Sequence, residues 1–142
     1  MNEGPAFGHG PGAPGQPGRP AMPPAEKIRC VLLLMAGIVV FLFLDRYQGP
    51  YAEAVRGQGG NVAVSFSLYF LLLIPLWRTR SPRFMSAIAA FAAVQLFEAT
   101  NGFGVMGNVY DPLDYLANAL GIGAALGIDA LMDLPDRSPG VR

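Results

Sequence analysis

Four apolar stretches separated by short polar segments limit what this 142-residue chain can fold into. They cover residues 28–44, 62–77, 84–97 and 113–132. Charged residues make up 14% of the sequence, against about 25% in typical soluble domains. The stretches also lack the polar outer faces that helices of soluble bundles carry, so we predict that they cross a membrane. A 16-residue helix spans only ~24 Å, so flanking Arg, Tyr and Trp side chains have to reach the interface.

The pattern predicts an all-α integral membrane protein, a four-helix bundle whose lipid contacts make the bilayer its main partner. The helices are expected at about residues 28–46, 62–78, 83–99 and 112–133. The predicted domains are an N-terminal tail (1–25), a four-helix transmembrane domain (26–134) and a short C-terminal tail (135–142). The N-terminal tail is rich in Gly and Pro and cannot bury enough apolar surface to offset its ordering entropy, so we predict that it is disordered.

The basic residues predict how the helices are oriented. Eight of the ten Lys and Arg residues lie before the first helix, in the second loop or after the fourth helix. Only Arg46 and Arg56 lie in the first loop, and the third loop has none. The positive-inside rule then places both termini in the cytoplasm. The net charge of zero argues against a nucleic-acid partner.

Single copies of cysteine and histidine exclude several classes of chemistry. Cys30 is the only cysteine and His9 the only histidine, which lies in the tail. No internal disulfide, zinc site of Cys and His ligands, or Ser-His-Asp arrangement can form from them. Catalysis, if any, would rest on carboxylates, hydroxyls or amides, and we predict no cofactor and leave enzyme activity undecided.

Polar side chains gather where the third apolar stretch ends and the fourth begins. Asp114 and Asn118 are four residues apart and share a helix face. If the third and fourth helices are antiparallel neighbours, five side chains meet at one outer corner, namely Gln95, Glu98, Asp111, Asp114 and Asn118. Such a group is able to bind Mg²⁺ or Ca²⁺, to share a proton, or to bind cationic or hydroxyl groups of a lipid-linked substrate. We assign no metal ligand among them.

The same residues also have a structural interpretation. Asp111 has the features of an N-cap, with Pro112 as first helical residue, and Asp114 falls where the acid of a capping box lies. Asn118 lies more than one turn into the span, where an amide is expected to hydrogen-bond across to another helix. Asp129 is expected to pair with Arg78, Arg80 or Arg83 of the second loop, as a structural contact.

Small residues recur along the fourth apolar stretch at helix-packing spacing. They are Ala117, Gly121, Gly123, Ala125 and Gly127. Such patterns let membrane helices approach closely. We favour packing between the third and fourth helices over a dimer interface.

The string YDPLDYLANALG, residues 110–121, together with Gln95 and Glu98 at the end of the third helix, resembles the VanZ-like family of bacterial membrane proteins. The residues that match are Glu98, Asp111, Asp114, Asn118 and Gly121. This chain differs from the family's pattern in the third loop, where many members of the family carry an Arg and this chain has none. It implies a multi-pass protein of the bacterial cytoplasmic (inner) membrane.

Two functions remain open at the level of the sequence. The resemblance implies a cell-envelope role, such as glycopeptide (teicoplanin) tolerance or handling of a lipid-linked precursor, with the acidic corner contacting the ligand. The alternative is a non-catalytic small membrane subunit or assembly factor, whose Gly and Ala faces pack against a partner protein. A corner that binds a ligand requires the carboxylates to converge, whereas a subunit requires an exposed stripe of small residues.

Overall fold

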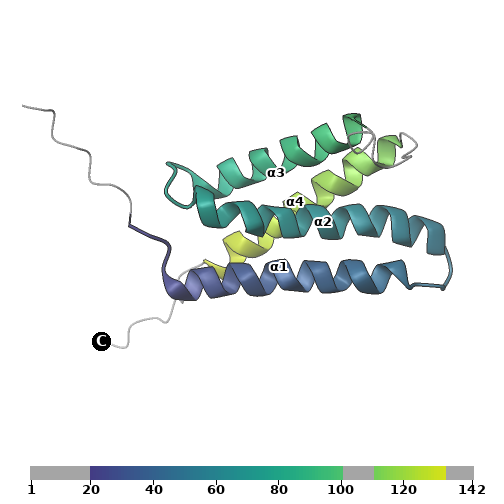
Figure 1. Cartoon of the computed structure of the whole chain (residues 1–142), viewed down its shortest axis with the longest axis horizontal. Coiled ribbons are helices and arrows are strands. Elements are labelled where there is room, and N and C mark those ends of the chain that lie inside the picture. Colours follow the sequence, from purple (N-terminus) through teal and green to yellow (C-terminus); the bar gives the residue numbers. More distant parts are fainter. Residues whose placement is uncertain (1–19, 101–110, 134–142) are drawn as a thin grey trace, which may run out of the picture.

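The computed structural model describes residues 20–100 and 111–133, which form four α-helices (Figure 1). The helices are α1 (Pro24–Asp45), α2 (Ala52–Leu76), α3 (Pro82–Ala99) and α4 (Pro112–Met132). The predicted all-α bundle is therefore confirmed. Most of the predicted N-terminal tail, most of the third loop and all of the predicted C-terminal tail lie outside the described residues.

Three of these helices, α1, α2 and α4, are long and apolar enough to cross a membrane. Their mean hydropathies over 18 residues are 2.4, 1.7 and 1.4. Their outer faces carry exposed apolar side chains, such as Phe43 at 75% and Leu131 at 67% exposure. Contact of such apolar faces with lipid chains costs no free energy, whereas their exposure to water would. The chain is therefore a multi-pass membrane protein by its described helices.

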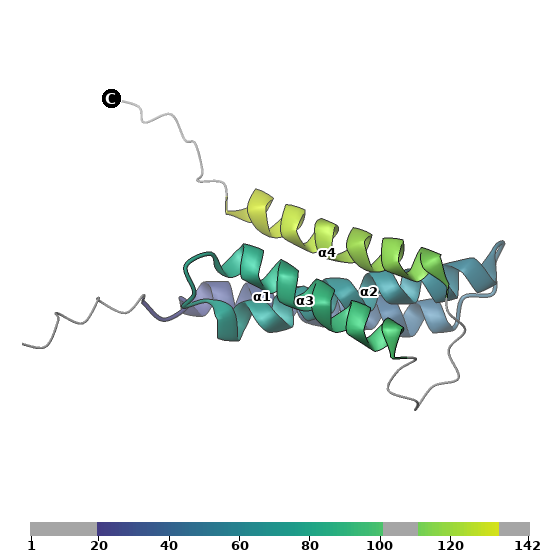
Figure 2. The same cartoon turned by 90° about the horizontal axis from the view of Figure 1, so that it is seen from above.

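The helix α2 lies at the centre of the bundle and packs against α1, α3 and α4 (Figures 1 and 2). Three hydrogen bonds from α2 to α4 join residues 53 positions apart, so these two helices run parallel. Because α2 ends at the opposite end of the bundle from the start of α4, the 18-residue α3 returns the chain toward the start of α4. The start of α1 and the end of α4 consequently lie at the same end.

The second helix differs from its predicted bounds. It begins at Ala52 rather than near residue 62, so the segment 57–61, which was expected to be part of a loop, is helical. A Cβ atom added to Gly59 would lie 3.0 Å from the side chain of Leu44, and Gly60 is buried. The glycines of this segment therefore allow α1 and α2 to pack closely. The chain turns instead at residues 46–51, where Tyr51 has a left-handed φ of 59°.

The buried small residues of α4 face α2. Ala117, Gly121 and Ala125 are buried. A Cβ atom on Gly121 would overlap the backbone oxygen of Val62 and lie 3.1 Å from the Cβ of Ser65. The close approach that Gly121 permits is thus with α2, which corrects the expectation that this stripe packs on the third helix.

The other two predicted packing residues of α4, Gly123 and Gly127, lie on its exposed side. A Cβ atom on either glycine would meet no other atom of the described chain within 4 Å. They therefore contribute nothing to the packing of the described helices, in contrast to Gly121.

Candidate functional site

A column of side-chain hydrogen bonds joins α2 to α4 over the first two turns of α4. The bonds run from Gln58 Nε2 to Asp111 Oδ2 (3.3 Å), from Asn61 Nδ2 to Asp114 Oδ1 (2.7 Å) and from Ser65 Oγ to Asn118 Oδ1 (2.6 Å). We call these six residues the polar ladder. The donors are spaced by three and four residues along α2, and the acceptors have the same spacing along α4, so each set occupies one helix face.

At the outer end of the ladder, Asp111 caps α4 as predicted. Its backbone is extended, with φ −123° and ψ 118°, and its Oδ1 accepts a hydrogen bond of 2.9 Å from the backbone N–H of Leu113. Pro112 is the first helical residue, where its missing N–H costs nothing. The second oxygen of Asp111 accepts the bond from Gln58. The carboxylate therefore joins α4 to α2 as well as capping it.

The carboxylate of Asp114 is buried without a basic partner. Asp114 is only 8% exposed, and the group that donates a hydrogen bond to it is the uncharged side-chain amide of Asn61. No Lys or Arg among residues 20–100 and 111–133 forms an ion pair with Asp111 or Asp114. A buried carboxylate whose charge is not compensated is costly in a protein interior. Within the described residues, the hydrogen bond that the Asp114 carboxylate accepts from a side chain comes from a neutral amide.

Asn118 forms the innermost rung of the ladder. It is 2% exposed and accepts from Ser65, as the prediction of a cross-helix hydrogen bond required. Its Nδ2 has no hydrogen-bond partner within the described residues. A buried donor left unpaired costs ~1–3 kcal/mol. The ladder therefore contains one N–H donor without an acceptor in addition to its three hydrogen bonds between helices.

Of the two predicted site residues of the third helix, Gln95 forms no hydrogen bond to the ladder within the described residues. Gln95 and Glu98 are both half-buried on α3. Neither Oε1 nor Nε2 of Gln95 has a partner in the part of the chain that the structure describes. The side-chain partners of Asp111, Asp114 and Asn118 come from α2, whereas the sequence placed these residues against the third helix. The corner is thus built on α2 and α4.

The α2 half of the ladder is not among the predicted site residues. Gln58 and Asn61 lie before the predicted start of the second helix at residue 62, and Ser65 lies inside it. The signal was nevertheless in the spacing, because Gln58, Asn61 and Ser65 repeat the intervals of Asp111, Asp114 and Asn118. Two matching polar faces of this kind indicate parallel helices in register.

A second polar cluster joins all four helices at the opposite end of the bundle. Asp129 of α4 is fully buried and accepts hydrogen bonds from Arg29 of α1 (2.7 Å), Tyr69 of α2 (3.1 Å) and Arg83 of α3 (2.8 Å). We call these four residues the four-helix clasp. Of the three predicted candidates, Arg78, Arg80 and Arg83, it is Arg83 that pairs with Asp129, while Arg29 and Tyr69 were not predicted.

Two more carboxylates surround the clasp. Glu26 lies 2.6 Å from Arg29, and Asp133 lies 2.6 Å from Arg83. Each guanidinium group therefore contacts the buried Asp129 and a second, more exposed acid. Because each guanidinium group is paired with carboxylates of the protein itself, the clasp serves to hold the helices together.

Comparisons with known proteins do not assign either cluster. No family model matches the chain, and no curated protein or solved structure is found to be similar to it. Among residues 20–100 and 111–133, no three His, Cys, Asp or Glu side chains are grouped so that they could hold a metal ion. The chemistry of the two clusters is therefore the basis for inferring a function.

Removal of the Ser65 hydroxyl tests how much a rung of the ladder contributes to stability. We expect Ser65→Ala to lower the free energy of unfolding in detergent by ~1 kcal/mol, because it leaves the Asn118 amide buried without its partner. Ser86→Ala is the matched control, since Ser86 is equally buried but bonds only within its own helix, to the Pro82 carbonyl. Equal losses for the two variants, measured by thermal unfolding, would show that the rung contributes nothing.

Proposed function

We propose that this chain is a multi-pass protein of the bacterial cytoplasmic membrane, related to the VanZ-like family, that acts at the cell envelope. In this proposal both termini are cytoplasmic, as the distribution of Lys and Arg residues requires. The four-helix clasp then lies on the cytoplasmic side, and Asp111 and Asp114 lie toward the outer surface. The ligand is bound at this outer end of the polar ladder.

The observation that carries the proposal is the contrast between the acids at the two ends of the bundle. Asp129 contacts two guanidinium groups, at 2.7 and 2.8 Å. Asp114 is nearly as buried and, within the described residues, is bonded only to an amide. A membrane protein that retains an uncompensated carboxylate at a helix end offers it to a ligand. Asn61 fixes the position of that carboxylate in advance, which lowers the entropy lost on binding.

The ligand class follows from the charge and the position of the carboxylates. They attract cationic groups and accept hydrogen bonds from hydroxyl groups, both of which occur in lipid-linked envelope precursors and in glycopeptides. The resemblance to the VanZ-like family favours glycopeptide tolerance or the handling of such a precursor. The proposal includes no reaction, because two carboxylates that each accept a hydrogen bond from an amide of α2 suffice for binding.

The test is to remove the charge of Asp114 without removing its hydrogen bond. We expect Asp114→Asn to lower teicoplanin tolerance, conferred by expression in a susceptible host, by about tenfold, the size expected for one lost charged hydrogen bond. The new amide oxygen still accepts from Asn61, so the fold is retained. Asp45→Asn is the control, because Asp45 is exposed at the same end of the bundle, at the end of α1.

The outcomes of this test are readily separated. Wild-type tolerance in Asp114→Asn, with the protein present in the membrane at wild-type amounts, would overturn the proposal that this carboxylate contacts the ligand. A host that gains no tolerance from the wild-type protein would overturn the glycopeptide role itself. Loss of tolerance in both Asp114→Asn and Asp45→Asn would mean that tolerance depends on the overall surface charge at this end, and would overturn a specific role of Asp114.

A non-catalytic membrane subunit is the second candidate, and the exposed Gly123 and Gly127 favour it. Helix pairs in membranes approach closely where such residues are spaced by four. In this case Gly123→Leu and Gly127→Leu would prevent co-purification with a partner protein, while Asp114→Asn would have no effect. The two candidates thus predict opposite sensitivities.

A further inference from the structure

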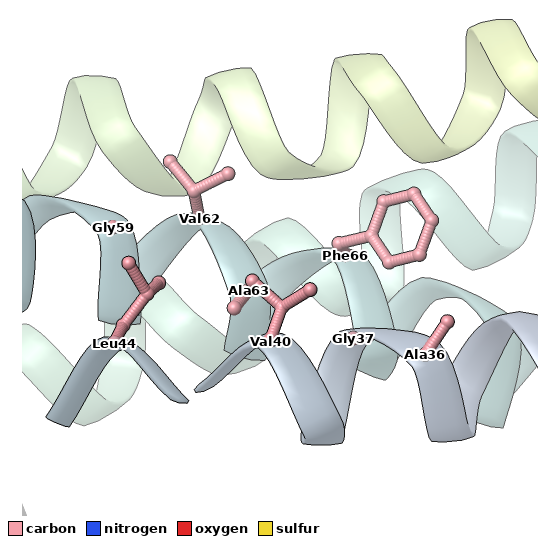
Figure 3. Close-up of a pocket in the computed structure, with 8 residues that line it drawn as sticks. All are labelled: Ala36, Gly37, Val40, Leu44, Gly59, Val62, Ala63 and Phe66. Atoms are coloured by element: carbon pink, nitrogen blue, oxygen red, sulfur yellow. The ribbon is translucent and has the colours of Figure 1, made fainter. Parts of the chain in front are cut away.

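A wholly apolar groove runs along the outer halves of α1 and α2 (Figure 3). It has a volume of about 380 Å³. Leu44 and Gly59 line its outer end, and Ala36 and Phe66 line its inner end, with Val40 between them. The groove exists because small residues of both helices leave space between the larger side chains.

The groove borders the polar ladder. Gly59 and Val62 line the groove, and each directly follows a ladder residue of α2, Gln58 and Asn61. The backbone of Val62 also approaches Gly121 closely, so Val62 lies beside α4. The apolar groove and the acidic end of the ladder are therefore adjoining surfaces of the same turns of α2.

The opening of the groove follows from how α1 and α4 lie on α2. Arg29 and Asp129 join the two helices at one end. In the described chain the backbone of α1 packs only against α2, and Figure 1 shows α4 crossing away from α1 toward its own start. The surface of α2 is therefore left uncovered between them at the outer end, where the groove lies.

In a bilayer, hydrocarbon fills a groove of this kind. Water has no polar partner there, and the groove lies within two helices that are long and apolar enough to span the membrane. From Leu44 to Ala36 the groove follows α1 for ~12 Å along its axis, from the outer end toward the bilayer centre. This is the path that one acyl chain of a lipid in the outer leaflet follows.

The adjoining ladder offers mainly hydrogen-bond acceptors to a head group. Asp111 and Asp114 have no cationic partner among the described residues, and Gln58 Oε1 is buried without a hydrogen bond. An ammonium group carries a positive charge and three N–H donors, which complements this set. Asn118 lies one turn deeper and is 2% exposed, and its Nδ2 donor is buried without a hydrogen bond in the described chain.

We propose that the groove and the outer end of the ladder form one binding site for a phospholipid that carries a primary amine. One acyl chain lies against Val40 between α1 and α2, and the ammonium group is held by Asp111 and Asp114. The inference rests on the proposed function in one respect, because it uses the same carboxylates. It adds the chemical class of the ligand and a second contact surface.

The probe is dioleoylphosphatidylethanolamine, compared with dioleoylphosphatidylglycerol, which has the same chains and no amine. The full-length protein in non-ionic detergent is titrated with each lipid, and bound lipid is counted by native mass spectrometry. We expect the amine lipid to bind about tenfold more tightly, as a charged hydrogen bond confers. The double variant Asp111→Asn/Asp114→Asn is expected to lose this preference, while Asp45→Asn keeps it.

The chain contact is tested by filling the groove. Val40 lines the groove and is 50% exposed, whereas its neighbour Val39 is 45% exposed and does not line it. We expect Val40→Phe to weaken binding of both lipids by about tenfold, and Val39→Phe to leave binding unchanged. The two substitutions add the same volume to one helix, so a general effect on folding or on the detergent micelle would appear in both.

Each outcome decides one part of the inference. Equal binding of the two lipids would overturn the ammonium contact, and equal binding by the two Val→Phe variants would overturn the groove as the chain site. If both lipids bind weakly and none of the variants changes their binding, the bound lipid is non-specific and the proposed site is overturned. If Asp114→Asn abolishes tolerance in cells but Val40→Phe does not, the proposed function stands and the lipid site falls.

Discussion

Substitution of Asp129 by leucine is expected to lower the free energy of unfolding by ~3–5 kcal/mol, a large part of the stability of a domain this size. The variant removes the carboxylate that contacts Arg29 and Arg83 and accepts from Tyr69. The two guanidinium groups, with side-chain exposures of 16% and 32%, then face each other without the buried acid between them. Thermal unfolding in detergent, followed by circular dichroism, measures the loss.

Two further variants separate the clasp from a general effect of charge. Asp133→Asn removes the partner of Arg83 whose side chain is 49% exposed, and we expect it to change stability by less than ~1 kcal/mol. The triple variant Arg29→Met/Arg83→Met/Asp129→Leu replaces the buried charges with apolar groups and is expected to regain most of the stability. A stable Asp129→Leu variant, or a triple variant less stable than it, would contradict this account.

Gly121→Leu is expected to cause the second large loss, about 3 kcal/mol or more, by forcing α2 and α4 apart. Even the first carbon of the new side chain would overlap the Val62 carbonyl oxygen, which is backbone and cannot rotate away. Because the displaced segment carries Asn61 and Ser65, the rungs of the polar ladder on either side of it would break as well. Resistance of the purified protein to unfolding by increasing detergent concentration reports this change.

Gly123→Leu is the matched control for this substitution. It adds the same side chain to the same helix two residues away, where a Cβ atom meets nothing within 4 Å in the described chain. We expect stability to remain within ~0.5 kcal/mol of the wild-type value or to rise, because leucine favours the helix more than glycine does. Similar losses for both variants would mean that the tight α2–α4 contact at Gly121 does not limit stability.

Hydropathy and local capping rules predicted much of the fold. The apolar stretches located all four helices, because the apolar character of a helix is a property of its own segment of the sequence. The cap at Asp111 was also predictable, since it depends only on neighbours in sequence. Arg83 was one of three predicted candidate partners of Asp129, because the second loop and the end of the fourth helix had to lie on the same side, and it is the one that forms the pair.

The pairing of helices could not be predicted by those rules. The start of α2 was placed ten residues too late, because glycines weaken an isolated helix but permit close packing in a bundle. Asp114 and Asn118 were assigned to a face shared with the third helix, since consecutive helices are the default neighbours. Their actual partners lie 53 residues earlier in the sequence. Only the matching spacing of the two polar faces held that information.

The parallel pairing of α2 and α4 has a consequence for biogenesis. When α1 and α2 enter the bilayer as a hairpin, Gln58, Asn61 and Ser65 do not yet have their partners, because α4 is still to be synthesised. The same holds for Arg29 and Tyr69, which wait for Asp129. Until α4 is inserted, these polar side chains lack the partners that α4 and its N-cap provide. Truncation before α4 should turn this chain into a substrate for membrane quality control.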